Sequence, residues 1–397
     1  MALRWSPQEA RLFQLFAVGL HGKSYPPGEE GIRRCFRDLR GVQLDPLPVL
    51  GRNHDLVIQA RVDGTHPGQF LDLVHRERIG FEYWDKVLCA IPIAEFPYFR
   101  ALMAAGGNRW KQRREERLSR EHPGAVEAVY EAVREHGPLS GAELRKLSVA
   151  QGVHRAWKAT RAANGALEVL WNRGRLSVAY RVHYRRYFDL TERVIPKELL
   201  SRPVPSLEDF QEHLLLKRVE MVGLLPAGGD AEVWAFLRSA RKERLPERLI
   251  AEGKLSLVQV EGIRTPFYAP PDAARRLAEA ERLPLADRAR FLAPLDSLLW
   301  GRGVLKKLWG FEYAWEVYKR PADRKWGYYV LPVLFHDRFV ARFDGRFDAK
   351  TKTLHVLGYW EEPNGLPLGH PAIQEAFQRF LHFLAGERIA FPSGLTA

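Results

Sequence analysis

Residues 163–190 decide the fold, and they read ANGALEVLWNRGRLSVAYRVHYRRYFDL. The first part carries apolar side chains at helical spacing, namely Ala163, Leu167, Leu170 and Trp171. Gly174 follows, where a helix commonly ends in the left-handed conformation. Beyond it, alternating apolar and polar residues predict strands over 176–182 and 187–190, joined by His183-Tyr184-Arg185-Arg186. The stretch therefore predicts a helix followed by a β-hairpin with a basic tip.

The residues before this stretch complete a module. Apolar residues on one helical face occupy 126–133, and Gly137-Pro138 ends that helix. Ser140 and Glu143 have the spacing of a capping box, which predicts a short second helix. The third helix is expected over about 154–173. Three helices and a hairpin are typical of a winged helix, which we place at 121–200.

A similar order of elements recurs on either side of that module. We therefore predict an α+β protein with tandem winged-helix modules, three in number, and a C-terminal β-barrel-like domain. The expected regions are 1–120, which carries a Gln-Leu-Asp motif, then 121–200, 201–285 and a β-rich 286–397. Strands of the last region are predicted over 312–318, 328–335, 339–343 and 353–357. The mixed-charge run 109–121 is expected to form a solvated linking helix.

Composition restricts the classes of partner and site. The 397 residues carry a formal net charge of +13, which favours a polyanion, although surface arginines of a thermophilic kind would give the same charge. Only Cys35 and Cys89 occur, with no paired Cys/His set, so no metal site and no cofactor is predicted. The N-terminal Ser6-Pro7-Gln8-Glu9 reads as a capping box rather than a signal peptide. No apolar run approaches the ~20 residues of a membrane span, and we expect a cytoplasmic monomer.

The run Gln43-Leu44-Asp45 is the candidate catalytic motif. On an extended segment its amide and carboxylate share one face, while Val42 and Leu44 point the other way. By the rise of a strand the two polar groups lie about 7 Å apart, which suits holding one water molecule between them. The alternative is structural, because an aspartate at the end of a short strand commonly caps a turn.

The motif gains weight from the segments that accompany it, which are 52–62, 81–84, 295–300 and 327–332. In this order and spacing they resemble the winged-helix DNA glycosylases of the AlkZ/YcaQ family over nearly the whole chain. That family excises N7-alkylated purines and unhooks interstrand crosslinks, and a Gln-aliphatic-Gln or Gln-aliphatic-Asp motif marks its catalytic site. The resemblance thus implies that Gln43 and Asp45 are catalytic, as in the YcaQ-like branch. Two departures are Lys86, where relatives often carry His, and Gly301, where they often carry Asp.

Candidate DNA-binding residues come from four places in the chain. We expect phosphate or groove contacts from basic side chains on the third helix of the winged helix and on its wing tip. Others are expected from the segment after the motif and from a basic C-terminal loop. They are Arg52, Asn53, His54, Arg155, Lys158, Arg161, Arg185, Arg186, Arg324, Lys325 and Trp326. His54 is equally compatible with a buried histidine, and the loop with a merely solvated turn. For the loop, which is basic with one aromatic residue, the hypothesis is that its tip wedges into a minor groove.

The chemistry expected of the motif is hydrolysis without a general acid. An N7-alkylated purine is already cationic and leaves as a neutral base, so one carboxylate suffices to stabilise the sugar cation and activate water. We therefore predict a monofunctional DNA glycosylase acting on double-stranded DNA in the bacterial nucleoid, in base excision repair and interstrand-crosslink repair. The alternatives are a winged-helix regulator without enzymatic activity, a damage-binding protein that has lost catalysis and, with less support, a metal-dependent nuclease.

Overall fold

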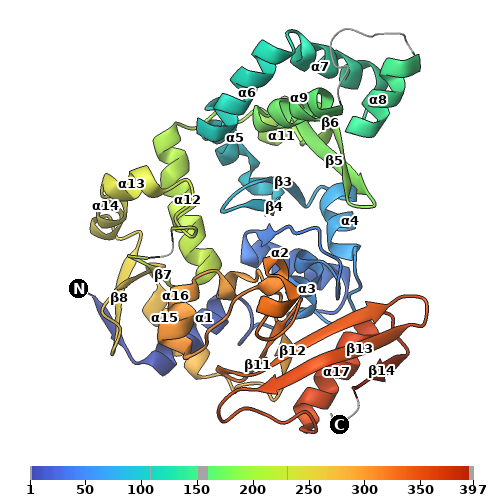
Figure 1. Cartoon of the computed structure of the whole chain (residues 1–397). Coiled ribbons are helices and arrows are strands. Elements are labelled where there is room, and N and C mark those ends of the chain that lie inside the picture. The colour runs from blue at the N-terminus through green and yellow to red at the C-terminus, as the bar shows by residue number, and fades with distance from the viewer. Residues whose placement is uncertain (1, 108, 151–159, 230, 393–397) are drawn as a thin grey trace. The chain divides into compact units, whose positions relative to one another are not determined.

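The structure, a computed structural model, describes residues 2–107, 109–150, 160–229 and 231–392. Helices and strands are mixed throughout, which confirms the α+β class (Figure 1). The chain divides into two compact units. Unit 1 combines 1–70, 86–88 and 214–397, and unit 2 combines 71–85 and 89–213. Because the chain leaves unit 1 and returns to it, segments that are distant in sequence share one core.

The first sheet of unit 1 joins the two halves of that unit. β1 (Leu3–Trp5) runs parallel to β8 (Ser256–Val260), with Leu3 opposite Val258. β8 pairs with β9 (Phe267–Ala269), which pairs with β7 (Leu225–Pro226). The N-terminal segment and the region 201–285 therefore share a sheet. The division of the chain into four regions stays a prediction.

Helices pack a hydrophobic core around this sheet. α1 (Pro7–Ala17) begins with the expected capping box, in which Ser6 Oγ accepts the N–H of Glu9 at 3.2 Å and Glu9 Oε2 accepts that of Ser6 at 2.6 Å. Its Phe13 lies in a cluster with Trp5 and Leu299. Other helices of unit 1 are α2 (Glu29–Leu39), α3 (Asn53–Gln59), α13 (Arg238–Lys242), α14 (Leu245–Ala251), α15 (Ala273–Glu281) and α16 (Arg302–Trp309).

The C-terminal part of unit 1 is an open sheet covered by a helix. The strand order is β10 (Arg290–Phe291), β11 (Leu331–Phe335), β12 (Arg338–Asp348), β13 (Thr353–Glu361) and β14 (Arg388–Ala390). Strands β10 and β14 are edges, so the sheet forms a half-barrel rather than a closed one. Phe377 and Phe380 of α17 (Pro371–Phe383), a helix that the sequence analysis missed, pack on Phe291 at centroid distances of 4.8 and 5.4 Å.

One predicted strand of this region is wrong. Residues 312–318 form an irregular segment that ends in the short 3-10 helix η3 (Glu316–Tyr318). The buried Glu316 carboxylate accepts the backbone N–H groups of Lys325 and Trp326 at 3.2 and 2.9 Å. These bonds close a loop, which prevents Glu316 from joining a sheet. The other 3-10 helices of unit 1 are η2 (Ser297–Leu299) and η4 (Pro321–Asp323).

Unit 2 contains the predicted helix–helix–helix–hairpin order at 121–200. The elements are α7 (Ala125–His136), α8 (Gly141–Ala150), α9 (Thr160–Asn172), β5 (Leu176–Val182) and β6 (Arg185–Leu190). The hairpin turn is shorter than expected, because only His183 and Tyr184 leave the strands, at φ of 44° and 67°. Arg185 and Arg186 belong to β6 instead. The number of winged-helix modules in the whole chain stays a prediction.

The rest of unit 2 surrounds this module. The hairpin β3 (Gly80–Trp84) and β4 (Leu88–Pro92) precedes α5 (Phe96–Ala104) and α6 (Arg109–Glu121). The remaining elements are α4 (Gln69–Arg76), η1 (Ile93–Glu95), α10 (Thr191–Val194) and α11 (Lys197–Leu200), and α12 (Leu207–Val222) begins in unit 2 and continues into unit 1 from Leu214. Helix α6 is more than a solvated linker, because Lys111 is buried with its Nζ 3.8 Å from the Trp84 ring centroid. None of the described helices combines the length and apolar character of a membrane span.

Candidate active site

The Gln43-Leu44-Asp45 motif begins in the short strand β2 (Val42–Gln43) of unit 1. Leu44 follows it, and its N–H donates to the carbonyl oxygen of Leu88 at 2.9 Å. Val42 and Leu44 are buried as expected, but Gln43 is buried too, with only 9% of its surface exposed. At Gln43 the polar side of the strand is therefore covered as well, and the prediction that Gln43 and Asp45 share one face stays a prediction.

The buried Gln43 amide keeps one atom unsatisfied. Its Oε1 is inaccessible and accepts no hydrogen bond from any described residue. A buried acceptor without a partner costs ~1–3 kcal/mol. Such an atom in a folded protein requires an explanation, and a bound water or a substrate group is one. Gln43 therefore has the burial and the unused hydrogen-bonding capacity of a residue that orients water.

Asp45 lies just beyond the strand and is half-buried. Its Oδ1 accepts the backbone N–H of Leu47 at 3.0 Å. This oxygen therefore caps the turn, as an aspartate at the end of a strand commonly does. Within the described residues Oδ2 makes no hydrogen bond, which leaves it able to accept one from water. Burial raises the pKa of the Asp45 carboxyl, and the bond from Leu47 opposes that shift. A raised pKa moves a carboxylate towards the range of a general base.

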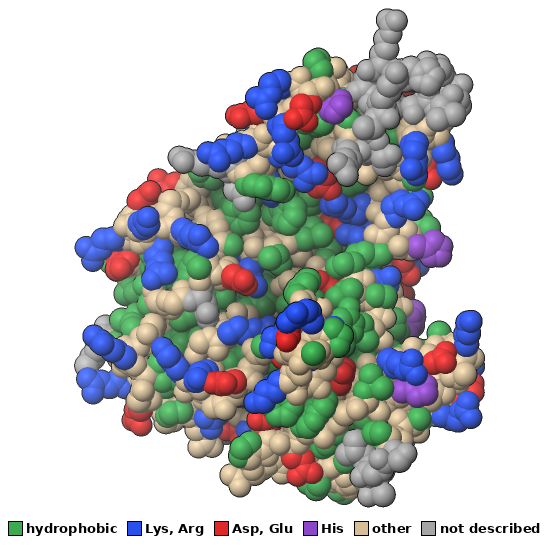
Figure 2. Space-filling model, viewed as in Figure 1, with side chains coloured by type: hydrophobic (Ala, Val, Ile, Leu, Met, Phe, Trp, Pro, Cys, Tyr) green, Lys and Arg blue, Asp and Glu red, His purple; other side chains and the backbone are tan. Residues whose placement is uncertain are grey.

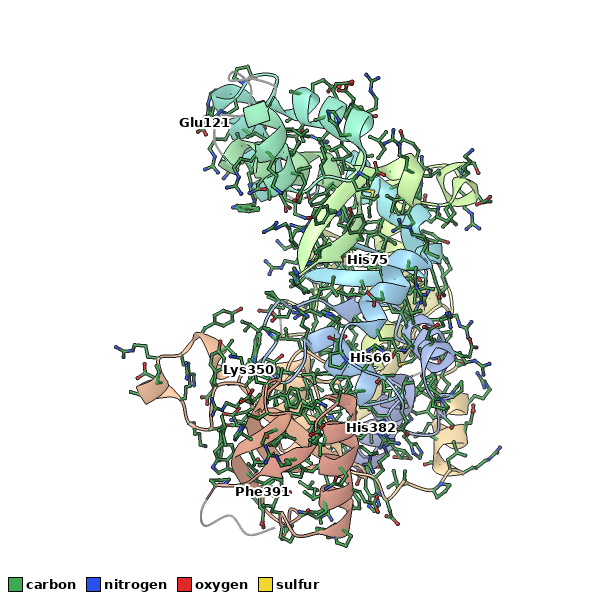
Figure 3. All side chains as sticks on the ribbon, turned by 90° about the vertical axis from the view of Figure 1, so that its right-hand side faces the viewer. His66, His75, Glu121, Lys350, His382 and Phe391 are labelled. Carbon is green, nitrogen blue, oxygen red and sulfur yellow. The ribbon has the colours of Figure 1, made fainter. Side chains whose placement is uncertain are left out.

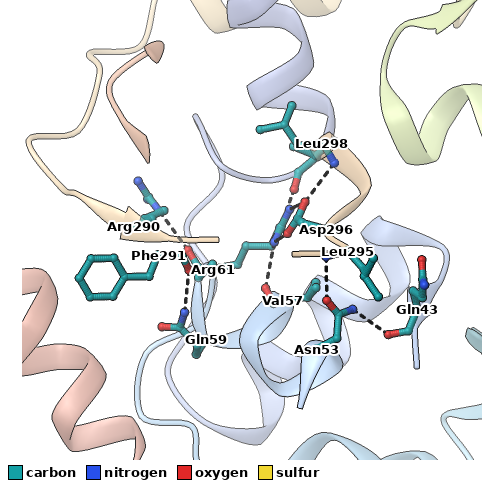
Figure 4. A network of polar contacts seen from close by, with 12 residues as sticks. Gln43, Asn53, Val57, Gln59, Arg61, Arg290, Phe291, Leu295, Asp296 and Leu298 are labelled. Carbon is teal, nitrogen blue, oxygen red and sulfur yellow. Dashed lines mark hydrogen bonds and ion pairs between the residues drawn. The ribbon is translucent and has the colours of Figure 1, made fainter. Parts of the chain in front are cut away.

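Asn53 fastens the motif to a distant segment. This first residue of α3 is fully buried, and its Nδ2 donates to the carbonyl oxygen of Gln43 at 2.9 Å. Its Oδ1 accepts the N–H of Leu295, also at 2.9 Å (Figure 4). One side chain thus bridges the motif strand and the segment at 295–300 through both ends of its amide. Asn53 is a positioning residue, and direct contact with DNA, as the sequence suggested, does not fit its burial.

A buried ion pair secures the same segment. The guanidinium of Arg61 donates to both oxygens of Asp296, at 2.7 and 3.0 Å, and neither side chain is exposed. Arg61 also donates to the carbonyl oxygens of Val18 and Val57. Asp296 in turn accepts the N–H of Leu298 and so caps η2. Breaking such a pair by removing one partner costs about 3–5 kcal/mol, so the pair holds α3 and 295–300 in register.

His54 is also directed inwards. The residue is 0% exposed, its ring lies 6.1 Å from that of Phe70, and its Nε2 lies 3.8 Å from Asp55 Oδ2. Asp55 Oδ1 accepts the N–H of Gly68. The burial of His54 agrees with the alternative of a buried histidine, and its contact with DNA stays a prediction. Arg52, which precedes α3, is partly exposed, and its DNA contact stays a prediction.

The two departures from the family pattern lie beside the same segment. Lys86 is buried, with its Nζ 3.1 Å from Glu232 Oε2 and 5.2 Å from the centroid of the Trp300 ring. The indole N–H of Trp300 donates to the carbonyl oxygen of Leu295 at 2.9 Å. Gly301 follows Trp300 directly. Lys86 is a residue to which the sequence analysis gave no role, and its substitution for His was the only signal.

The basic residues predicted on the winged helix are placed only in part. Arg155 and Lys158 lie outside the described residues, as does the side chain of Arg161. Arg185 is exposed on β6, whereas Arg186 pairs with Glu168 and lies 4.9 Å from the Trp171 ring centroid. On the face seen in Figure 2, Lys and Arg side chains are spread over many elements and mixed with Asp and Glu.

The basic C-terminal loop presents a different aromatic residue from the one expected. Trp326 is partly covered and packs on Trp360, at a centroid distance of 5.6 Å. The exposed aromatic is Tyr318, of which 83% is exposed. Burial raises the pKa of Glu316, but hydrogen bonds from Lys319 and from the backbone outweigh it and bring this pKa to about 2. The ionised Glu316 carboxylate therefore stabilises the conformation of the loop. Arg324 and Lys325 are part of this loop.

Comparisons with known proteins identify the family and the fold of the chain. The family model described as "DNA glycosylase AlkZ-like" matches residues 36–383. The chain is also similar to a solved structure, the DNA glycosylase AlkZ of Streptomyces sahachiroi, at 15% sequence identity and a TM-score of 0.60. That likeness covers 98% of this chain and 100% of the other. The shared fold thus extends over both units.

Proposed function

Because the chain belongs to the AlkZ-like family of DNA glycosylases, we propose that it hydrolyses the N-glycosidic bond of N7-alkylated purines through Gln43 and Asp45. The observation that carries the proposal is the pairing of two unused acceptors in one motif. Among the residues that the structure describes, Gln43 Oε1 is buried without a partner, and Asp45 Oδ2 makes no hydrogen bond, whereas Asp45 Oδ1 accepts the N–H of Leu47. Both atoms are suited to one water molecule.

Each residue then has a separate role. Asp45 stabilises the positive charge that develops on the sugar and accepts a proton from the attacking water. Gln43 Oε1 accepts a hydrogen bond from the same water and so limits its orientation. Asn53 keeps the backbone of Gln43 in place. No general acid is required, because the alkylated base leaves as a neutral molecule.

We further propose that the reaction stops at the abasic site. Opening the sugar would require attack by an uncharged amine. The lysine to consider near the motif strand in unit 1 is Lys86. Its Nζ lies 3.1 Å from Glu232 Oε2 and 5.2 Å from the centroid of the Trp300 ring. An amine held by these contacts is not positioned to attack the sugar. Borohydride should therefore trap no covalent complex between the protein and abasic DNA.

The proposed substrate is double-stranded DNA in the nucleoid, bound by a monomer, and includes crosslinked purines. A base tethered to the opposite strand cannot rotate fully out of the duplex, so a protein that grips the backbone is physically more suitable than one that flips the base. The loop that carries Tyr318 supplies an exposed aromatic ring, and the two basic residues that follow it, Lys319 and Arg320, pair with Glu316 and Asp323. We propose that Tyr318, in place of Trp326, enters the minor groove.

The test is a single-turnover assay on a duplex with one N7-methylguanine. Wild type should release the base, whereas Asp45→Asn should lose at least ~10²-fold in rate, the usual contribution of a general base. Asp287→Asn makes the same change at an exposed position and should keep the wild-type rate. Retained DNA binding by Asp45→Asn excludes a general loss of structure. If wild type only binds the duplex and releases no base above the spontaneous rate, the chain is a damage-binding protein or a regulator.

A further inference from the structure

A cavity of about 350 Å³ in unit 1 lies between α17 and the loop that follows α3. His382, which faces it from α17, is labelled in Figure 3. The volume is within the range of small-ligand sites. The polar side chains that line it offer mostly hydrogen-bond donors, among them Gln59, Thr65, Arg288, Gln378, Arg379 and His382.

The charges around this cavity do not cancel. Arg288 donates to both oxygens of Asp63, at 2.7 and 2.5 Å, so that pair is neutral. Arg379 donates to the carbonyl oxygen of Ala289 at 2.9 Å and reaches only the exposed Glu375, at 3.4 Å. These contacts leave the positive charge of Arg379 only weakly compensated.

A third guanidinium adds to the excess. Arg290 donates to two backbone carbonyl oxygens, those of Ala60 and Arg288, and to no carboxylate among the described residues. Burial lowers the pKa of Arg290 to about 9, and the charges of Arg288, Arg61 and Arg379 act in the same direction. Burial and then Arg288 also lower the pKa of Arg379. The positive charge of Arg288, Arg290 and Arg379 is thus larger than the negative charge of the carboxylates that contact them.

We propose that this cavity binds a phosphate group, with Arg379 and Arg288 as its principal ligands. A guanidinium matches two phosphate oxygens with parallel hydrogen bonds, and two guanidiniums at one cavity favour an anion with several oxygens. Gln378, on α17 beside Arg379, supplies a neutral donor, while the Thr65 hydroxyl, which lines the cavity, donates to the carbonyl oxygen of Val62. The Nε atom of Arg288 is also buried without a partner among the described residues, so its own carboxylate does not satisfy it fully. The phosphate belongs either to a DNA strand or to a free phosphate.

The cavity is connected to the motif by one short helix. Asn53 at the start of α3 holds Gln43, and Gln59 at its end lines the cavity. At 1.5 Å per residue these ends are about 9 Å apart along the helix axis, which is less than the rise of three nucleotides. The case in which the phosphate belongs to a DNA strand rests on the proposed function. In that case, phosphate binding stabilises the helix that positions the motif.

Inorganic phosphate is the first probe. Thermal unfolding of the full chain is followed against phosphate concentration at constant ionic strength, because binding to the folded state raises Tm by mass action. Arg379→Gln should weaken phosphate affinity about tenfold, the worth of one charged hydrogen-bond pair. Asp63→Asn should strengthen it, since it removes the carboxylate that competes for Arg288. Arg379→Lys serves if the glutamine variant does not fold. Equal phosphate dependence in wild type and the Arg379 variants would overturn the proposal.

Undamaged duplex DNA then identifies the source of the phosphate. If a DNA phosphate occupies the cavity, Arg379→Gln should reduce the slope of log K against log salt by about 1. If that slope is unchanged while phosphate still raises the Tm of wild type more than that of Arg379→Gln, the ligand is a free phosphate and the site stands in that form. Both measurements use undamaged DNA or no DNA at all, so a failed glycosylase assay leaves them unaffected.

Discussion

Replacing Asn53 should uncouple the motif from the segment that supports it. Asn53→Ala removes the donor to the Gln43 carbonyl and the acceptor for the Leu295 N–H, both at 2.9 Å, the first bond buried and the second part-buried. Each unsatisfied backbone group costs about 1–3 kcal/mol. The free energy of unfolding should therefore fall by about 2–5 kcal/mol, since small relaxations recover part of the sum.

A second variant separates the two bonds. Asn53→Asp keeps an oxygen for the Leu295 N–H but turns an oxygen towards the Gln43 carbonyl, so the bond to the motif is replaced by repulsion between two acceptors, and a carboxylate is buried. Its rate of base release should fall by at least about tenfold, because misplacement of a catalytic group by ~1 Å is enough for a large loss. Stability is measured by urea unfolding and the rate under single-turnover conditions. Asn164→Ala, at an exposed position of α9, is the matched control.

The reasoning would be refuted by an Asn53→Ala protein whose stability lies within ~0.5 kcal/mol of wild type, the range of an ordinary surface change. It would also be refuted by an Asn53→Asp protein that is destabilised and yet releases the base at the wild-type rate. The first result would mean that the two bonds contribute nothing net. The second would mean that the position of the Gln43 backbone does not matter to the reaction.

Three further predictions follow from single residues. Burial raises the pKa of Asp45 in the folded protein above 3.8, so ionisation of this carboxyl lowers the free energy of unfolding as the pH rises. Asp45→Asn should therefore be at least as stable as wild type at neutral pH. Urea unfolding should show that this difference in stability disappears below pH 3.8. Burial lowers the pKa of Lys111 from 10.5 to about 7, so wild-type stability should rise with pH between these values, and Lys111→Met should flatten that rise in the same assay. Tyr318→Ala should weaken binding to duplex DNA by about tenfold at unchanged Tm, whereas Tyr318→Phe keeps the ring and should bind as wild type does; equal affinity of both variants would exclude stacking.

Local signals in the sequence were sufficient for the elements of the winged-helix module. The helix ending before Gly174 and the strand Leu176–Val182 appear as predicted, because capping, helical spacing and alternation depend on residues a few positions apart. The capping box at Ser6 was predictable for the same reason. The Gln43–Asp45 motif was found from the pattern of residues and the family resemblance, neither of which requires knowledge of what covers the strand.

Only the tertiary structure decided which of these residues are accessible and what they touch. Asn53 reaches Leu295, and Arg61 reaches Asp296, across most of the chain length. The same folding buries His54, covers Trp326 and exposes Tyr318. Burial depends on the segments that pack against a residue, and in unit 1 these come from the opposite end of the chain. Sequence therefore determined the local elements and the motif, and long-range packing determined which side chains position, react or meet solvent.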